Sequence, residues 1–407
     1  MPIETKNRVT CTGCALLCDD IAVDVQFGTI QAVHNACLRG SKKFLQGKNE
    51  QLLKTPFVGG KATSYDDALA EAARIFKGAK NIVIAGGTHG TIDAVRALVK
   101  LGIKHGAKFA IPHFSIFTQL KRAIRKNGMD FFSIGESVNN ADLIVFWGAN
   151  PVDLAPKLLV RAAFSRGRYR QSGKEVKKLA VIDDYPTPTM ERADIKILVD
   201  DQNHSGMLHS LSSALIDQNA SDPSLSDLVD AIKNCEYCTL FVGEGILNKH
   251  FLDAHPAFIN DLLCFIRALN AKRRVAMLPI FYPWNAAGLM QELACTSERI
   301  DCFDIDDLPS HANNIDVILA FGLDLVSRFT RNAAIMASGV QVIAIDFKRT
   351  PTTDLAHVVI PPSISGIESG GTAMRLDGII LVLNPPRQQS ERKKTDEDIL
   401  NDLYEKT

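Results

Sequence analysis

The sequence predicts an α/β protein with parallel sheets, and three observations lead to this prediction. Short apolar runs that suit buried strands alternate with segments of helical apolar spacing. One pattern occurs twice, because DLIVFWG at residues 142–148 matches DVILAFG at residues 316–322. Cysteines are crowded at the N-terminus. We therefore expect a small N-terminal cysteine module followed by two Rossmann-like parallel-sheet units.

The cysteine module has the spacing C-x2-C-x3-C-x18-C, and its members are Cys11, Cys14, Cys18 and Cys37. Three thiols in one loop and a fourth returned by a hairpin provide the four ligands of a metal site. The apolar stretches 21–25 and 30–33 predict the strands of that hairpin, with its turn at 27–29. Gly13 lets the loop backbone pass close to a cluster.

Strands and helices alternate beyond the module. A first unit, residues 61–203, contains a helix over 65–76 with Ser64 as its N-cap and further helices at 92–101 and 117–125. Its predicted strands are 81–85, 108–111, 142–148, 179–183 and 195–199. A second unit, residues 204–384, is predicted from a helix at 262–269 and strands at 239–242, 275–278, 316–322 and 341–346. Residues 1–60 hold the module, and 385–407 form a charged tail with a weak helix near 397–404.

The repeat continues after each copy of the strand. The stretches VID, PT and ADIKILV between residues 181 and 199 resemble AID, PT and AHVVI between residues 344 and 360. Asp183 and Asp346 therefore end strands at equivalent points. Ligands of such sheets can lie at the carboxyl ends of the strands. We interpret Asp183 and Asp346 themselves as residues that cap a turn.

Composition limits the possible partners and compartment. The 407 residues include 46 basic and 46 acidic side chains, and a net charge of zero argues against nucleic acid or an anionic membrane as a partner. No apolar run reaches the ~18–20 residues of a membrane span, and the first residues lack the apolar region of a secretory signal. Nine cysteines suit a cytoplasmic metal site better than a disulfide framework.

Other candidate residues have simpler interpretations. The glycine-rich turn at 86–90 is not G-x-G-x-x-G, and we interpret it as a tight turn into a helix. The Cys235–Cys238 pair is interpreted as structural, and the remaining cysteines as small buried residues: Cys264, Cys295 and Cys302. His89 and His204 are expected in exposed loops.

Three segments carry a resemblance to a known family: residues 11–20, residues 135–151 and residues 366–378, which reads GIESGGTAMRLDG. They resemble the B subunit of formylmethanofuran dehydrogenase, in the molybdopterin oxidoreductase superfamily that includes formate dehydrogenases. The resemblance implies a cysteine-bound [4Fe–4S] cluster and two α/β domains that hold a bis-pterin tungsten or molybdenum centre. It also implies reduction of carbon dioxide to formate.

The sequence departs from this family at three places, one of which is a shortened insertion between Met290 and Cys302. The family's metal-ligating cysteine is missing from residues 110–118, where Ser115 and Ile116 supply no thiolate and His113 is isolated. Residues 281–284 are Phe-Tyr-Pro-Trp where the family has an arginine and a histidine, so the positive charge for formate is absent. Trp284 is expected to fill space that the cofactor leaves.

This combination resembles the B subunit of the bacterial formyltransferase/hydrolase complex of methylotrophs. That resemblance implies subunits of A, C and D type as partners in tetrahydromethanopterin-dependent formaldehyde oxidation. It also implies a redox-inactive scaffold without catalytic residues, molybdopterin or tungsten. The alternative is an active formylmethanofuran dehydrogenase subunit. For the four cysteines, a [4Fe–4S] cluster, a structural zinc and a vestigial site without metal all remain open.

Overall fold

The computed structural model describes residues 2–49, 52–171, 173–219, 222–296, 300–328, 339–387 and 393–407. The chain divides into two compact units. Unit 1 comprises Met1–Phe114, Pro283–Arg375 and Ile380–Thr407, and unit 2 comprises Ser115–Tyr282 and Leu376–Ile379. Unit 2 is therefore an insertion within unit 1.

The N-terminal module of unit 1 is a three-stranded antiparallel sheet followed by a helix. Its elements are β1 (Glu4–Val9), β2 (Ile21–Gln26), β3 (Thr29–His34) and α1 (Leu38–Asn49), and the sheet order is β1-β2-β3. The hairpin β2–β3 is where the sequence predicts it, with Phe27 and Gly28 both at positive φ in the turn. Strand β1 has no counterpart among the sequence predictions, because its alternation is mostly polar and exposed.

The main sheet of unit 1 has eight strands in the order β13-β7-β6-β14-β15-β16-β4-β5. Their bounds are β4 (Phe57–Val58), β5 (Lys61–Ala62), β6 (Ile82–Gly86), β7 (Lys108–Ile111), β13 (Cys302–Asp304), β14 (Val317–Phe321), β15 (Gln341–Ile345) and β16 (Val358–Val359). The first six strands in this order, from β13 to β16, each pair in parallel with their neighbours. A separate hairpin consists of β17 (Thr372–Met374) and β18 (Ile380–Val382).

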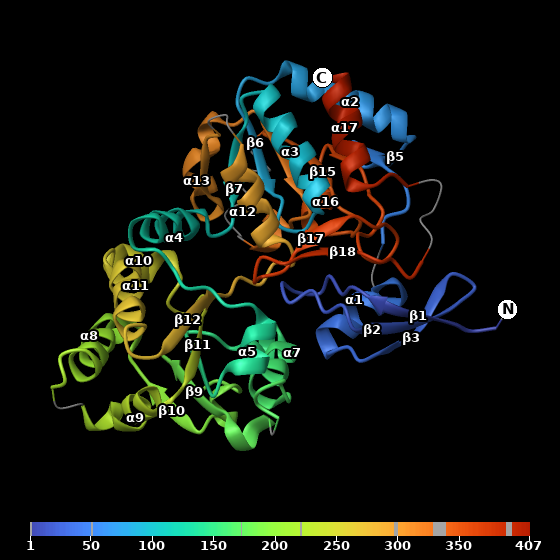
Figure 1. Cartoon of the computed structure of the whole chain (residues 1–407). Coiled ribbons are helices and arrows are strands. Elements are labelled where there is room, and N and C mark those ends of the chain that lie inside the picture. Colours follow the sequence, from blue (N-terminus) through green and yellow to red (C-terminus); the bar gives the residue numbers. More distant parts are fainter. Residues whose placement is uncertain are drawn as a thin grey trace. The chain divides into compact units, whose positions relative to one another are not determined.

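Helices cover both faces of this sheet because successive strand residues point to opposite sides. On one face, Ile82 and Ile84 pack with residues of α2 (Tyr65–Gly78), α3 (Ile92–Lys104), α12 (Ala286–Cys295) and α17 (Asp396–Lys406). On the other face, Val83 and Ala85 pack with residues of α13 (Leu308–His311) and α14 (Leu325–Arg328); α16 (Pro351–Leu355) follows β15 (Figure 1). The two clusters form the core of unit 1.

Unit 2 is built on a five-stranded parallel sheet in the order β10-β9-β8-β11-β12. The strands are β8 (Leu143–Trp147), β9 (Lys178–Asp183), β10 (Ile195–Leu198), β11 (Tyr237–Val242) and β12 (Arg274–Pro279). Its helices are α4 (Phe114–Asn127, whose first residue belongs to unit 1), α5 (Ile134–Asn140), α6 (Pro151–Leu154), α7 (Pro156–Leu159), α8 (His204–Leu215), α9 (Ser226–Asn234), α10 (Lys249–Ala254) and α11 (Phe258–Leu269). A single π-helical turn spans Val160–Phe164.

The two sheets repeat the same hydrogen-bonded details. Asp142 accepts from the amides of Glu236 and Tyr237, and Asp316 accepts from those of Lys80 and Asn81, all at 2.8–2.9 Å. Asp142 thus joins the start of β8 to the start of β11, and Asp316 joins the start of β14 to the start of β6, its neighbour in the sheet.

A second repeated detail lies after the matched strands. Thr189 Oγ1 donates to Asn150 at 2.6 Å, and Thr352 Oγ1 donates to Asp324 at 2.7 Å. Each threonine also accepts a backbone amide, from Val152 and Val326 respectively. The sequence repeat is therefore a structural repeat, with β8 and β9 equivalent to β14 and β15.

The predicted domain boundaries differ from these units. The boundary at 203/204 falls between β10 and β11 and so divides the sheet of unit 2. Local apolar patterns cannot show that β6 pairs with β14, which follows unit 2 in the chain. The predicted tail at 385–407 is not separate either, because Ile399, Leu400 and Leu403 of α17 are fully buried in the core of unit 1. Among the described residues, none of the helices has the length and apolar character needed to span a membrane.

Candidate functional site

The four predicted ligand cysteines lie in one region of unit 1. The backbone closes the loop through hydrogen bonds from Cys11 N to Cys18 O at 2.8 Å and from Leu17 N to Cys14 O at 3.1 Å. Cys37 directly precedes α1, and its sulfur accepts from Gly40 N at 3.5 Å. The predicted hairpin therefore does return the fourth cysteine to the loop that holds the other three.

The loop is compact enough for its thiols to influence one another. Burial, together with smaller contributions from the other three cysteines, raises the pKa of Cys11 to about 12. A Cβ atom at Gly40 would lie 3.1 Å from the Cys11 sulfur and 3.9 Å from the Cys37 sulfur, so glycine keeps space open between them. Gly13 has the same role, since its Cβ would lie 3.3 Å from the Cys11 sulfur.

The donor set fits an iron–sulfur cluster in kind, because four thiols lie close enough to influence one another and glycines border the Cys11 and Cys37 sulfurs. Among the described side chains, no group of three or more His, Cys, Asp or Glu stands at the spacing that one metal ion requires. That these cysteines bind a metal, and which metal they bind, remain predictions.

A pocket of about 250 Å³ opens at the carboxyl ends of the unit 1 strands. The chain leaves β6 toward β7 and leaves β14 toward β15 in the opposite direction, so the neighbours β6 and β14 mark the point where strand order reverses. The pocket is lined by residues that follow these strands and by others from α1, α17 and the loop after β16, including Lys43, His89, Trp284, Asp346, Ser363 and Asp396.

Glycines bring the two turns at this point together. Gly86 has φ 107°, and a Cβ there would collide with the Phe321 carbonyl oxygen. A Cβ at Gly90 would lie 2.6 Å from the Phe321 ring. The turn at 86–90 is thus a close-packed entry into α3, as the sequence predicts, and it also carries His89 into the pocket wall.

The titratable groups of the pocket are strongly perturbed. Desolvation and the neighbouring Lys43 and Arg39 lower the pKa of His89 to about 4, so its imidazole is neutral at pH 7. Desolvation and Lys348 lower the pKa of Lys43 to about 8. His89 keeps an exposed surface because the pocket is open to water, yet protein surrounds the ring on its other sides. The prediction of His89 as an exposed loop residue is confirmed, and the structure adds that this residue lines the pocket.

Of the three carboxyl groups that line the pocket, Asp346 and Asp396 have raised pKa values, whereas at Asp324 burial is outweighed by hydrogen bonds with Ser327 and Thr352, which lower its pKa. Burial raises the pKa of Asp346 to about 6 and that of Asp396 to about 7. Asp396 accepts from Ser365 Oγ at 2.9 Å, while the buried Ser363 Oγ has no partner among the described residues. The pocket therefore offers an ammonium, a neutral imidazole and an unsatisfied hydroxyl, which together suit binding of a small polar ligand.

Lys43 connects this pocket electrostatically with the cysteine loop. The carboxylates of Asp346 and Asp396 favour its protonated form, as does Cys11 when its thiol is ionised. Its ammonium also lies 4.9 Å from the centre of the Phe347 ring. No sequence pattern singles out this lysine, since it lies on a polar helix among other basic residues.

Trp284 and Asn285 occupy the segment in which the sequence departs from the family. Trp284 is buried and packs with Leu17 of the cysteine loop and with Ala373 and Leu383 beside it. Asn285 is completely buried, donates to Gly90 O at 2.8 Å and accepts from Met374 N at 2.8 Å. This asparagine ties the turn after β6 to strand β17.

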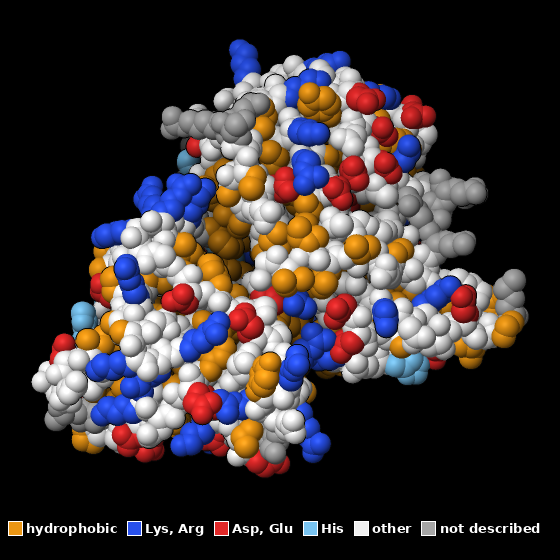
Figure 2. All heavy atoms as spheres, in the orientation of Figure 1, with side chains coloured by type: hydrophobic (Ala, Val, Ile, Leu, Met, Phe, Trp, Pro, Cys, Tyr) orange, Lys and Arg blue, Asp and Glu red, His pale blue; other side chains and the backbone are white. Residues whose placement is uncertain are grey.

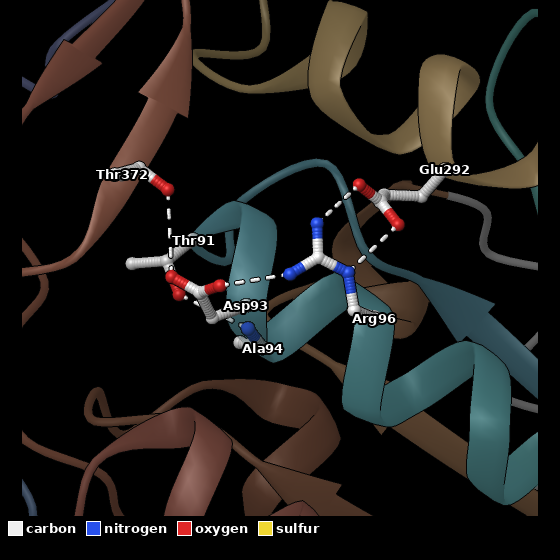
Figure 3. A network of polar contacts seen from close by, with 6 residues as sticks. All are labelled: Thr91, Asp93, Ala94, Arg96, Glu292 and Thr372. Carbon is white, nitrogen blue, oxygen red and sulfur yellow. Dashed lines mark hydrogen bonds and ion pairs between the residues drawn. The ribbon is translucent and has the colours of Figure 1, made fainter. Parts of the chain in front are cut away.

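Helix α12 follows Asn285 and is held by an ionic network (Figure 3). Arg96 of α3 forms two hydrogen bonds with Glu292, at 2.8 and 3.2 Å, and one with Asp93 at 3.1 Å. Asp93 in turn accepts from Thr372 of β17 at 3.4 Å. The network thus joins α3, α12 and β17 around the Asn285 contacts.

The segment 110–118 crosses from β7 into α4. The boundary between the two units falls within it, after Phe114, and His113 takes a left-handed conformation with φ 62°. In unit 2, the ring centroids of Phe117 and Phe281 lie 4.4 Å apart. No thiol lies in this segment.

Two other expectations about single residues are wrong. His204 is buried rather than exposed, and its Nδ1 accepts from the Trp147 indole at 3.0 Å. Cys264 and Cys295 are exposed rather than buried, because their helices turn these positions outward, and Cys302, on the edge strand β13, is only half-buried. Asp183 ends β9 as predicted, and burial raises its pKa to about 7.

The comparisons with known proteins concern nearly the whole chain. The molybdopterin oxidoreductase family model matches residues 64–406. The B subunit of the tungsten-containing formylmethanofuran dehydrogenase 2 of Methanocaldococcus jannaschii is 27% identical, and that of Methanococcus maripaludis is 26% identical. Both alignments span 435 positions and cover 99% of either chain.

Two solved structures have a similar fold. One is a chain of the formyltransferase/hydrolase complex FhcABCD from Methylorubrum extorquens with methylofuran, with a TM-score of 0.68 and 19% identity over 86% of this chain and 98% of that one. The other is acetylene hydratase from Pelobacter acetylenicus, with a TM-score of 0.63 and 12% identity over 98% of this chain and 69% of that one.

Proposed function

The chain belongs to the molybdopterin oxidoreductase family, and on this premise we propose that it is the B-type member of a formyltransferase/hydrolase complex. In this role it acts as a redox-inactive scaffold. The reaction of the complex releases formate from formyl-tetrahydromethanopterin through a methanofuran-type carrier. Its partners are subunits of the A, C and D types, in agreement with the similarity to a chain of the FhcABCD complex.

The observation that carries the proposal is the lack of a thiolate in residues 110–118. A pterin-bound tungsten or molybdenum centre of the kind that the resemblance implies needs a soft ligand from the protein there, and alanine, isoleucine, serine and phenylalanine supply none.

Apolar bulk at residues 281–284 supports the same conclusion. Trp284 contributes to a core cluster with Leu17, so it has a packing role and supplies no charge. Phe281 and Tyr282 are also almost fully buried. No cation in this stretch can hold formate or carbon dioxide during a reduction. We therefore derive no redox step for this chain.

The cysteine loop keeps a separate structural role in the proposal. Cys11, Cys14, Cys18 and Cys37 would hold a [4Fe–4S] cluster, whose chemistry is electron storage and whose bonds cross-link the loop to α1. The chain's own contribution is to bury the thiols and to keep the glycine-lined space open. A cluster here would fix the loop that carries Leu17 against Trp284.

Elemental analysis of the purified complex tests the proposal. We expect about four iron and about four sulfide per chain, with tungsten and molybdenum absent. The double variant Cys11→Ser/Cys14→Ser should lose the iron, and the matched control Cys235→Ser/Cys238→Ser should retain it. Stoichiometric tungsten or molybdenum in the unmodified complex would overturn the redox-inactive role.

One observation favours a second function. Both curated relatives are subunits of a tungsten-containing formylmethanofuran dehydrogenase and align over 99% of the chain. An active dehydrogenase subunit would need an unusual metal ligand in place of cysteine. Oxidation of reduced viologen in the presence of carbon dioxide by the metal-replete complex would favour this alternative, and no such activity would exclude it.

A further inference from the structure

Helix α4 carries a cluster of four cations on the surface of unit 2. They are Lys121, Arg122, Arg125 and Lys126, and all four are exposed. Figure 2 shows basic side chains gathered over this helix. Among the described residues, none of the four takes part in an ion pair. The positive charge of this helix is therefore not neutralised within the described chain.

The arrangement works against the stability of the helix itself. Lys121 and Arg125 are four residues apart, as are Arg122 and Lys126, and like charges at this spacing repel. The helix dipole favours cations only in the last turn, which holds Arg125 and Lys126. It does not account for Lys121 and Arg122. An anionic partner removes the repulsion and explains the cluster.

A groove of about 630 Å³ runs beside these cations. Arg122 and Lys126 line one side from α4, and Leu252, Pro256 and Ile259 provide an apolar side from α10 and the start of α11. Asp253 is the acidic residue of the lining. The groove therefore pairs cationic and apolar groups along the same path.

The walls of the groove are fixed in position. Asn127 at the end of α4 donates its side-chain amide to Asn260 Oδ1 of α11 at 3.0 Å. Asn260 lies in the groove, and its own amide group remains a donor. A preformed groove loses little entropy when a partner binds.

We propose that the groove between α4 and α10–α11 binds an acidic segment of a partner polypeptide, with apolar side chains between its carboxylates. The cations match the carboxylates, and the apolar wall matches the intervening side chains. Nucleic acid fits less well, because the lining has no aromatic residue on which a base can stack. The proposal uses only this groove and does not depend on the metal content of the chain.

The test is binding of a fluorescent peptide of Leu-Glu-Glu repeats to the full chain, measured by anisotropy at several salt concentrations. We expect salt-sensitive binding that weakens by about tenfold in the double variant Arg122→Gln/Lys126→Gln, since two surface ion pairs are lost. The matched control is Lys77→Gln/Lys100→Gln, which removes two exposed cations of unit 1 and should leave the affinity unchanged. Circular dichroism checks that each variant is folded.

Four results would overturn the proposal. The first two are no measurable binding by the unmodified chain and an equal loss of affinity in the control variant. The third is tighter binding of a single-stranded oligonucleotide of equal charge that depends on the same two residues, which would assign the groove to nucleic acid. The fourth is retained affinity in the double variant, which would exclude this groove as the site.

Discussion

Replacing Asn285 with alanine is expected to destabilise unit 1 by about 4 kcal/mol. The side chain is completely buried and forms two hydrogen bonds of 2.8 Å, one to Gly90 O and one from Met374 N. Each buried backbone group that loses its partner costs about 1–3 kcal/mol, so the two together give roughly 2–6 kcal/mol. Asn285→Asp is a sharper variant, because it keeps the acceptor for Met374 N but places a carboxylate against the Gly90 carbonyl.

Urea denaturation followed by tryptophan fluorescence measures this effect. The chain has two tryptophans, with Trp284 in unit 1 and Trp147 in unit 2, so a Trp147→Phe background reports on unit 1 alone. Asn314→Ala, at an exposed position of the same unit, is the control and should change the free energy of unfolding by less than about 0.5 kcal/mol. A loss below about 1 kcal/mol for Asn285→Ala would refute the assignment of Asn285 as the link between the turn and β17.

Two further predictions concern buried charges. Lys177→Met should destabilise unit 2 by about 3–5 kcal/mol in thermal or urea unfolding, because the buried ammonium donates to the carbonyl oxygens of Val138, Ala162 and Ser165. Lys178→Met, at the exposed neighbouring position, is the control. Equal stability of the two variants would contradict the role of Lys177. Burial raises the pKa of Asp396 in the folded chain to about 7, whereas its pKa in the unfolded chain is near 4. Between these values the folded chain keeps a proton that the unfolded chain has lost, so the free energy of unfolding falls as the pH rises from about 4 to about 7. Asp396→Asn should therefore gain up to about 4 kcal/mol relative to the unmodified chain between about pH 4 and about pH 8 in urea titrations, and a constant difference across this range would show that another group, such as Asp346 or Lys43, carries the titration.

All five strands of the unit 2 sheet, and β6, β7, β14 and β15 of unit 1, could be predicted because parallel strands buried on two faces are continuous apolar runs. The short strands β4, β5, β13 and β16 were not predicted, because two or three residues carry no such run. Strands β6, β8 and β14 lie within a residue of the expected positions for this reason. The repeat was also visible, since Thr189 after β9 and Thr352 after β15 form equivalent hydrogen bonds and lie in matching Pro-Thr pairs of the sequence. The pairing of strands across the inserted unit could not be predicted, because Asp316 binds Asn81 across 235 residues.

The candidate site was predicted only where its residues are close in sequence. The cysteine spacing pointed to one region, and the structure brings all four cysteines there. The pocket gathers single residues from many segments, and the polar helix that holds Lys43 gives no sign that this lysine interacts with Asp346 and Asp396. Only the tertiary fold distinguishes Lys43 from the other basic residues of that helix.

The insertion of unit 2 within unit 1 has a consequence for synthesis on the ribosome. Strands β6 and β7 emerge early, but β14, the neighbour of β6, follows only after all of Ser115–Tyr282. Unit 2 holds all five strands of its sheet within that stretch, so it can fold while β6 waits. The apolar strands Ile82–Gly86 and Lys108–Ile111 are thus unprotected for the longest time, and chaperone binding during translation should concentrate on them.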